Sequence, residues 1–168
     1  MKILLVSDTH GSDELLQNIV KQEEPIDYMI HCGDIEGSEE RIRYMTMGPV
    51  LMVRGNNDFY TDLQFDVSLP LEGHRILVTH GHTHGVYSSH ETLREFAKAK
   101  GHDIVMYGHI HRPVVDDSDP ACLVLNPGSL TYPRQNGRQP TYMVVTLERG
   151  KKPEVEVKYV GKKKRGWF

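Results

Sequence analysis

The most constraining feature of this sequence is a short apolar segment that ends abruptly in a carboxylate and an imidazole. Residues 2–6 are almost wholly apolar and branched, which is typical of a strand covered on both faces in an α/β sheet. Asp8 and His10 follow two residues apart, so on an extended backbone both side chains leave the same face. This segment predicts either a site at the end of a first strand or an ordinary turn with a helix cap.

The same arrangement recurs along the first two thirds of the chain. Further apolar segments that run into polar residues lie at 28–31, 49–53, 74–79 and 104–107. Apolar residues at helical spacing predict helices after Gly11, over 38–45 and over 88–100. The alternation of strands and helices predicts an α/β fold, in which ligands bind at the carboxyl ends of the strands.

The later part of the chain has a different pattern. Residues 65–69 alternate in polarity, and strands without helices are predicted beyond residue 114, over 114–115, 121–125, 142–147 and 154–159. No repeat or linker interrupts the chain. We therefore predict one domain over residues 1–168, with a second, largely antiparallel sheet.

Composition and charge exclude several classes of protein. The 168 residues carry a net charge of −3, so no general basic field attracts nucleic acid or membrane. The basic run 162–165 is interpreted as a solvated terminus rather than a nucleic-acid contact. Cys32 and Cys122 are typical of buried free thiols in a reducing compartment. With neither a signal peptide nor a membrane-spanning segment expected, we predict a cytoplasmic protein without a membrane partner.

Seven polar side chains at the predicted strand ends form the candidate metal-binding set. They are Asp8, His10, Asp34, Asn56, His80, His109 and His111. Oxygen and nitrogen ligands without thiolate suit Mn²⁺ first, with Fe²⁺, Zn²⁺, Ni²⁺ or Mg²⁺ as alternatives, rather than a cysteine-bound structural zinc. Seven ligands exceed the need of one transition ion, so we predict two divalent ions, with Asp34 as the natural bridging carboxylate.

Each of these residues also has a structural interpretation. Asp8 and Asp34 could cap loops, His80 and His109 could be hydrogen-bonded core histidines, and Asn56 could occupy a left-handed turn.

The other six histidines are interpreted separately from this set. Four are interpreted as structural, at element edges without partners: His31, His74, His90 and His102. His82 and His84 lie close to the predicted site, and His82 is the better candidate for contact with a substrate phosphate.

The motifs D-T-H, G-D, G-N-x-D, T-H-G-H and G-H-I-H, in this order between Asp8 and Ser129, resemble the calcineurin-like metallophosphoesterase superfamily. The sequence is most similar to the small single-domain bacterial and archaeal phosphodiesterases, and the retromer cargo-binding subunit shares their fold. The resemblance implies a four-layer α-β-β-α sandwich with two mixed sheets.

The resemblance also implies how the ligands divide between the two metals. One metal is bound by Asp8, His10 and His111, the other by Asn56, His80 and His109, and Asp34 bridges them. A hydroxide between two such ions would attack the phosphorus of a phosphodiester.

One departure from the superfamily pattern bears on mechanism. Many members have a histidine after the ligand asparagine, where this chain has Asn57, and an amide cannot supply a proton. His82 or water would have to replace that acid. We therefore predict a phosphodiesterase that favours good leaving groups.

Several questions stay open at this stage. The substrate is expected to be a small phosphodiester, with cyclic nucleotides, nucleic-acid ends and lipid head groups all in view, and nucleic acid only as substrate. The alternatives are a phosphomonoesterase or nuclease, and a non-enzymatic protein-binding scaffold, for which Trp167 and Phe168 are the candidate contact residues. Strands expected at the edge of the carboxyl-terminal sheet leave a homodimer open.

Overall fold

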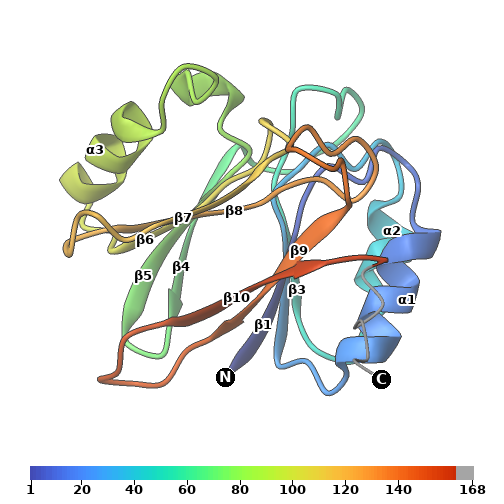
Figure 1. The fold of residues 1–168 in the computed structure, drawn as a ribbon, viewed down its shortest axis with the longest axis horizontal. Coiled ribbons are helices and arrows are strands. Elements are labelled where there is room, and N and C mark those ends of the chain that lie inside the picture. Colours follow the sequence, from blue (N-terminus) through green and yellow to red (C-terminus); the bar gives the residue numbers. More distant parts are fainter. Residues whose placement is uncertain (162–168) are drawn as a thin grey trace, which may run out of the picture.

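Two five-stranded sheets face each other, and helices cover their outer faces, in a computed structural model that describes residues 1–161 (Figure 1). The first sheet has the strand order β10-β9-β1-β2-β3. Its strands are β1 (Lys2–Val6), β2 (Tyr28–His31), β3 (Val50–Met52), β9 (Thr141–Thr146) and β10 (Glu154–Tyr159). β1, β2 and β3 are parallel, whereas β9 and β10 are antiparallel to their neighbours.

The second sheet has the order β4-β5-β6-β8-β7. Its strands are β4 (Asp66–Leu71), β5 (His74–Thr79), β6 (Ile104–Met106), β7 (Pro113–Asp116) and β8 (Leu123–Pro127). The three central strands are parallel, and β4 and β7 are antiparallel edges. Both sheets are therefore mixed, as the resemblance implied.

The expectation of a largely antiparallel second sheet, drawn from the strand pattern alone, is wrong. The strands that follow residue 113 divide between the sheets, because β8 extends the parallel centre of the second sheet whereas β9 pairs with β1 of the first. Alternation of polarity describes a single strand, and the pairing partner of a strand is set by tertiary contacts.

Three apolar clusters separate the layers of the sandwich. Side chains such as Ile30, Val78 and Met143 fill the space between the two sheets. On the outer face of the first sheet, helices α1 (Glu14–Glu23) and α2 (Glu39–Arg43) pack through residues such as Ile19. Helix α3 (Glu91–Ala99) covers the second sheet. The order α-β-β-α is thus confirmed, with each large buried side chain contributing roughly 1.5–3 kcal/mol.

Other expectations are met only in part. Both cysteines are buried and free. Within residues 1–161, no helix has the length and apolar character needed to cross a membrane. The basic run 162–165 and the pair Trp167 and Phe168 lie outside the described residues. The single domain, the cytoplasmic location and the homodimer stay predictions.

A buried carboxylate fastens the end of α1 to the first sheet. Glu23 has only 4% of its side chain exposed, and its Oε1 accepts hydrogen bonds from Tyr142 and from Lys158, both at 2.8 Å. Lys2 lies 3.2 Å from the other oxygen. Burial by itself raises the pKa of Glu23, but Lys158, Tyr142 and Lys2 together outweigh it and hold the pKa below its usual value.

We expect Glu23→Gln to destabilise the chain by about 1–3 kcal/mol at neutral pH, because buried donors lose a charged acceptor. Since the folded pKa is depressed, the ionised carboxylate stabilises the fold above the unfolded value near 4.5, and this stability is lost as the pH falls through the folded value. Urea unfolding across this pH range should show the free energy of unfolding of the wild type falling to that of the variant as the pH is lowered. Exposed Glu14→Gln is the control. A difference that stays constant with pH would contradict the assignment.

Candidate metal centre

The turns after the parallel strands of both sheets meet at one edge of the sandwich, toward the top of Figure 1. Non-glycine residues rarely adopt a positive φ, yet eight do so among the described residues, and five of these are predicted ligands. The five are Asp8, His10, Asp34, His109 and His111. Such turns let the chain reverse at once, so side chains point back across the strand ends, and non-glycine strain of this kind is concentrated at functional sites.

Four of the predicted ligands form one compact cluster. The ligand atoms of Asp8, His10, Asp34 and His111 lie within 4.8 Å of one another, a spacing compatible with the binding of one metal ion. His111 Nε2 is 3.0 Å from Asp8 Oδ1 and 3.4 Å from His10 Nε2.

The remaining three predicted ligands lie on the other side of Asp34. His80 Nε2 is 3.5 Å from Asp34 Oδ2 and 3.1 Å from Asn56 Oδ1. The His109 ring lies 5.0 Å from the His80 ring. Asp34 Oδ2 is also 4.0 Å from His10 Nε2, so this one oxygen lies near histidines of both groups.

The hydrogen bonds of the cluster leave lone pairs directed inward. His111 Nδ1–H donates to Tyr132 O at 2.8 Å, so in the neutral imidazole Nε2 presents a lone pair toward Asp8. Asp8 Oδ1 is buried and has no hydrogen-bond partner. Two acceptors in contact are unfavourable unless a cation lies between them, and these residues therefore fit a divalent ion.

The electrostatics of the cluster also favour a cation. Burial alone would raise the pKa of Asp34, but hydrogen bonding and the charge of His80, followed by Asn57, hold that pKa far below its usual range. Burial lowers the pKa of His109 to about 4, and the charge of His80 adds to this effect, so His109 keeps a free lone pair at neutral pH.

Asp58 shapes the turn that presents Asp34, and the sequence interpretation missed it. Its buried carboxylate accepts four backbone N–H groups, from Asp34, Ile35, Glu36 and Gly55, at 2.7–2.9 Å. The motif G-N-x-D already contained this residue. An acid next to a cluster of Asn and Gly was the available signal for a loop-bracing carboxylate.

Glu36 was missed as well. Its Oε1 lies 2.7 Å from His10 Nδ1, so the carboxylate orients the ring and turns Nε2 toward the cluster. A carboxylate behind a metal-binding histidine raises its basicity as a ligand. No sequence signal identified it, because residues 10 and 36 are brought together only by the pairing of β1 with β2.

Two glycines allow the loops to approach closely. A Cβ at Gly55 would collide with Asp34, and a Cβ at Gly108 would collide with Ser7 Oγ. These positions require glycine because backbone and ligand side chains are in contact there.

The two predicted catalytic residues lie beside the cluster. Asn57 donates its side-chain N–H to Asp34 Oδ2 at 2.8 Å and its backbone N–H to Oδ1 at 2.9 Å. The His82 ring is 5.4 Å from His80 and 6.1 Å from His109, and its Nδ1 is buried without a hydrogen-bond partner.

The other histidines have hydrogen-bond partners outside the candidate ligand set, which corrects the expectation that four of them have none. The pairs are His31 with Thr9, His74 with Asp103, His90 with Asp116, and His102 with Ser68. His84 pairs with Asp66 at 3.1 Å and does not join the site.

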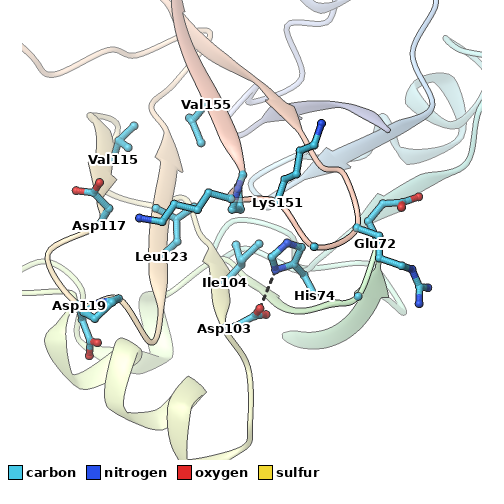
Figure 2. A pocket seen from close by; sticks show the side chains of 16 residues that line it. Glu72, His74, Asp103, Ile104, Val115, Asp117, Asp119, Leu123, Lys151 and Val155 are labelled. Carbon is cyan, nitrogen blue, oxygen red and sulfur yellow. Dashed lines mark hydrogen bonds and ion pairs between the residues drawn. The ribbon is translucent and has the colours of Figure 1, made fainter.

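A hollow of about 790 Å³ lies at the opposite end of the sandwich, where β6 and β8 begin. Figure 2 shows His74 and Asp103 hydrogen-bonded at its rim and Lys151 reaching over it from the β9–β10 turn. None of the seven candidate ligands lines it, so we do not assign it to the metal site.

Residues 1–150 match the sequence profile of the Calcineurin-like phosphoesterase superfamily domain. The probable metallophosphoesterase YsnB of Bacillus subtilis is 38% identical over 151 residues, covering 88% of this chain and 85% of YsnB. Phosphodiesterase MJ0936 of Methanocaldococcus jannaschii is 30% identical over 146 residues, covering 76% of this chain and 83% of that protein.

Two crystal structures share the fold. That of a predicted phosphoesterase from Streptococcus pneumoniae TIGR4 has a TM-score of 0.82, with 26% identity over 94% of this chain and 88% of that chain. Vps29 of Entamoeba histolytica in complex with zinc has a TM-score of 0.75, with 18% identity over 95% of this chain and 99% of that chain. The expected sharing of the fold with this retromer subunit is confirmed.

We expect Glu36→Gln to weaken binding of Mn²⁺ by about 10–100-fold, because a neutral amide holds the His10 ring more weakly and no longer raises its basicity. Calorimetric titration of metal-stripped protein measures this directly. Exposed Glu40→Gln is the matched control. Equal affinity in the two variants would show that Glu36 does not act on the metal centre.

Proposed function

The chain belongs to the calcineurin-like phosphoesterase superfamily, and we propose that within it the protein is a phosphodiesterase that works with two divalent metal ions. One ion would be held by Asp8, His10 and His111. The other would be held by Asn56, His80 and His109. Mn²⁺ is the first expectation for both.

The observation that carries this proposal is the position of Asp34. Its Oδ2 lies 4.0 Å from His10 Nε2 and 3.5 Å from His80 Nε2, so one carboxylate has a histidine of each group beside it. That arrangement supports a bridging role. When bound, two such ions would lower the pKa of a water molecule and offset the charge of the phosphate.

The reaction is a hydrolysis, in which a water oxygen bonds to phosphorus and one ester P–O bond breaks. The products are a phosphomonoester and an alcohol, and the leaving oxygen takes up a proton or departs as a stable anion. Asn57 cannot provide that proton, because an amide N–H is not acidic; it donates a hydrogen bond to Asp34 Oδ2 instead. His82 has an unpartnered ring nitrogen beside the cluster, and we assign it contact with the substrate phosphate.

We expect metal-stripped protein to hydrolyse bis-p-nitrophenyl phosphate only after Mn²⁺ is added. Asp34→Asn should lower kcat by at least ~10²-fold, since a neutral amide bridges two cations poorly. The measurement pairs turnover with metal counting on both proteins, and exposed Asp62→Asn is the control.

The outcomes separate the alternatives. Stoichiometric metal without turnover of any phosphoester would favour a protein-binding scaffold. Faster turnover of a monoester would move the assignment to a phosphomonoesterase, and faster turnover of duplex DNA would move it to a general nuclease. Protein that binds no metal would contradict the whole proposal.

We further expect aryl phosphodiesters to be hydrolysed at least ~10²-fold faster than alkyl phosphodiesters, because general-acid help of ~10²–10⁴-fold is missing at Asn57. Steady-state kinetics with a matched pair of diesters tests this. A burst measurement shows whether the chemical step is limiting. Equal rates with chemistry limiting would show that another group protonates the leaving oxygen.

A further inference from the structure

Four aromatic rings form a continuous row across the His80 side of the metal centre. Phe65 lies 5.5 Å from His82, His82 lies 6.1 Å from His109, and His109 lies 5.1 Å from Tyr87, measured between ring centroids. We call this set the ring row. Its two middle members flank the centre, and its two outer members belong to the β3–β4 connection and to the loop before α3.

An arginine lies over each end of the ring row. The guanidinium carbon of Arg54 is 5.0 Å from the Phe65 centroid, and that of Arg134 is 6.0 Å from the Tyr87 centroid. Arg134 also donates a hydrogen bond to the Tyr87 hydroxyl.

The backbone N–H of each arginine is hydrogen-bonded, within the β3–β4 connection for Arg54 and to a candidate ligand residue for Arg134. Arg54 N donates to Gln64 O at 2.8 Å, beside Phe65, and Arg134 N donates to His111 O at 2.9 Å. These bonds order the backbone at both arginines, and the ring contacts place their guanidinium groups at the two ends of the row.

Neither of these arginines forms an ion pair with a carboxylate among residues 1–161. The arginine ion pairs in that part of the chain involve Arg41 and Arg94. A guanidinium without a carboxylate partner is available to bind phosphate in its two-pronged geometry.

The outer rings are open to solvent. Phe65 is 43% exposed and Tyr87 is 59% exposed, although both touch a histidine of the site. Exposed aromatic faces beside unpaired arginines are the two elements by which proteins bind single-stranded nucleic acid, through base stacking and backbone contacts.

We propose that the ring row and its two arginines bind a single-stranded oligonucleotide, with the reacting phosphodiester over His82 and His109. The bases on either side stack on Phe65 and Tyr87, and the next phosphates contact Arg54 and Arg134. The cleavage of this ligand rests on the phosphodiesterase proposed above, whereas its binding does not.

The symmetry of the row selects this class of substrate. A cyclic nucleotide has one phosphate and one base, so it leaves one arginine and one outer ring unused. A lipid head group carries no planar ring for either end. An oligonucleotide alone among these supplies a charged and a planar group on both sides of the reacting bond.

The test is the fluorescence anisotropy of a labelled, phosphorothioate hexathymidylate with the Mn²⁺-loaded full chain. We expect Arg54→Gln, Arg134→Gln, Phe65→Leu and Tyr87→Leu each to raise Kd by about 10-fold, the size of one lost stacking or phosphate contact. Arg149→Gln, at the opposite end of the sandwich, and Tyr44→Leu, at the exposed end of α2, are the controls. Each row arginine variant should also lower the slope of log Kd against log salt by about 0.7.

A second readout uses the unmodified hexathymidylate. In the variants of the two arginines and of the two outer rings, kcat/KM for the oligonucleotide should fall more than kcat/KM for bis-p-nitrophenyl phosphate. Row variants that bind like the controls, or wild-type protein that does not bind the oligonucleotide, would overturn this inference while hydrolysis of bis-p-nitrophenyl phosphate stood. Binding by the row without hydrolysis of any diester would overturn the proposed function alone.

Discussion

The buried charge of Asp34 is the constraint on which the site depends. A carboxylate that is 1% exposed is costly unless positive groups surround it, and this one has His80, two N–H groups of Asn57 and His10 within reach. Those partners come from both sheets. The fold must therefore bring the carboxyl ends of two parallel strand sets to one place, and the α-β-β-α sandwich does this by facing the sheets toward each other.

The same constraint explains why the turns are strained. A ligand that follows a strand directly must turn back over the strand end, and a positive φ at Asp8, Asp34 and His109 achieves this at a cost of about 1–3 kcal/mol each. Asp58 offsets part of that cost, because its carboxylate collects four backbone N–H groups that the turn leaves free. The strain in these turns is thus partly offset by the hydrogen bonds that the Asp58 carboxylate accepts.

The gathering of the seven candidate ligands at one edge of the sandwich could be predicted from the sequence, because the signal is local to each strand end. A strand followed by Asp or His identifies both an element and a candidate ligand, so all seven side chains could be named before their distances were known. Glu36 could not, since its partner is 26 residues away and the two meet only through the pairing of parallel strands. The placement of β9 was missed for the same reason, because alternation defines a strand and not its neighbour.

In the proposed binding mode, chemistry is assigned to the strand ends and recognition to the connections around them. The cluster is made by residues at strand ends, whose positions the two sheets fix. Arg54, Phe65, Tyr87 and Arg134 lie outside the strands, where sequence can change without moving the ligands. Yet the hydrogen bond from Arg134 N to His111 O ties one of these connections to the site, and the bond from Arg54 N to Gln64 O braces the other internally. Substitutions in an ordered loop of this kind can alter substrate preference while the metal ligands stay in place. The residues around the cluster are therefore the ones that determine the substrate class.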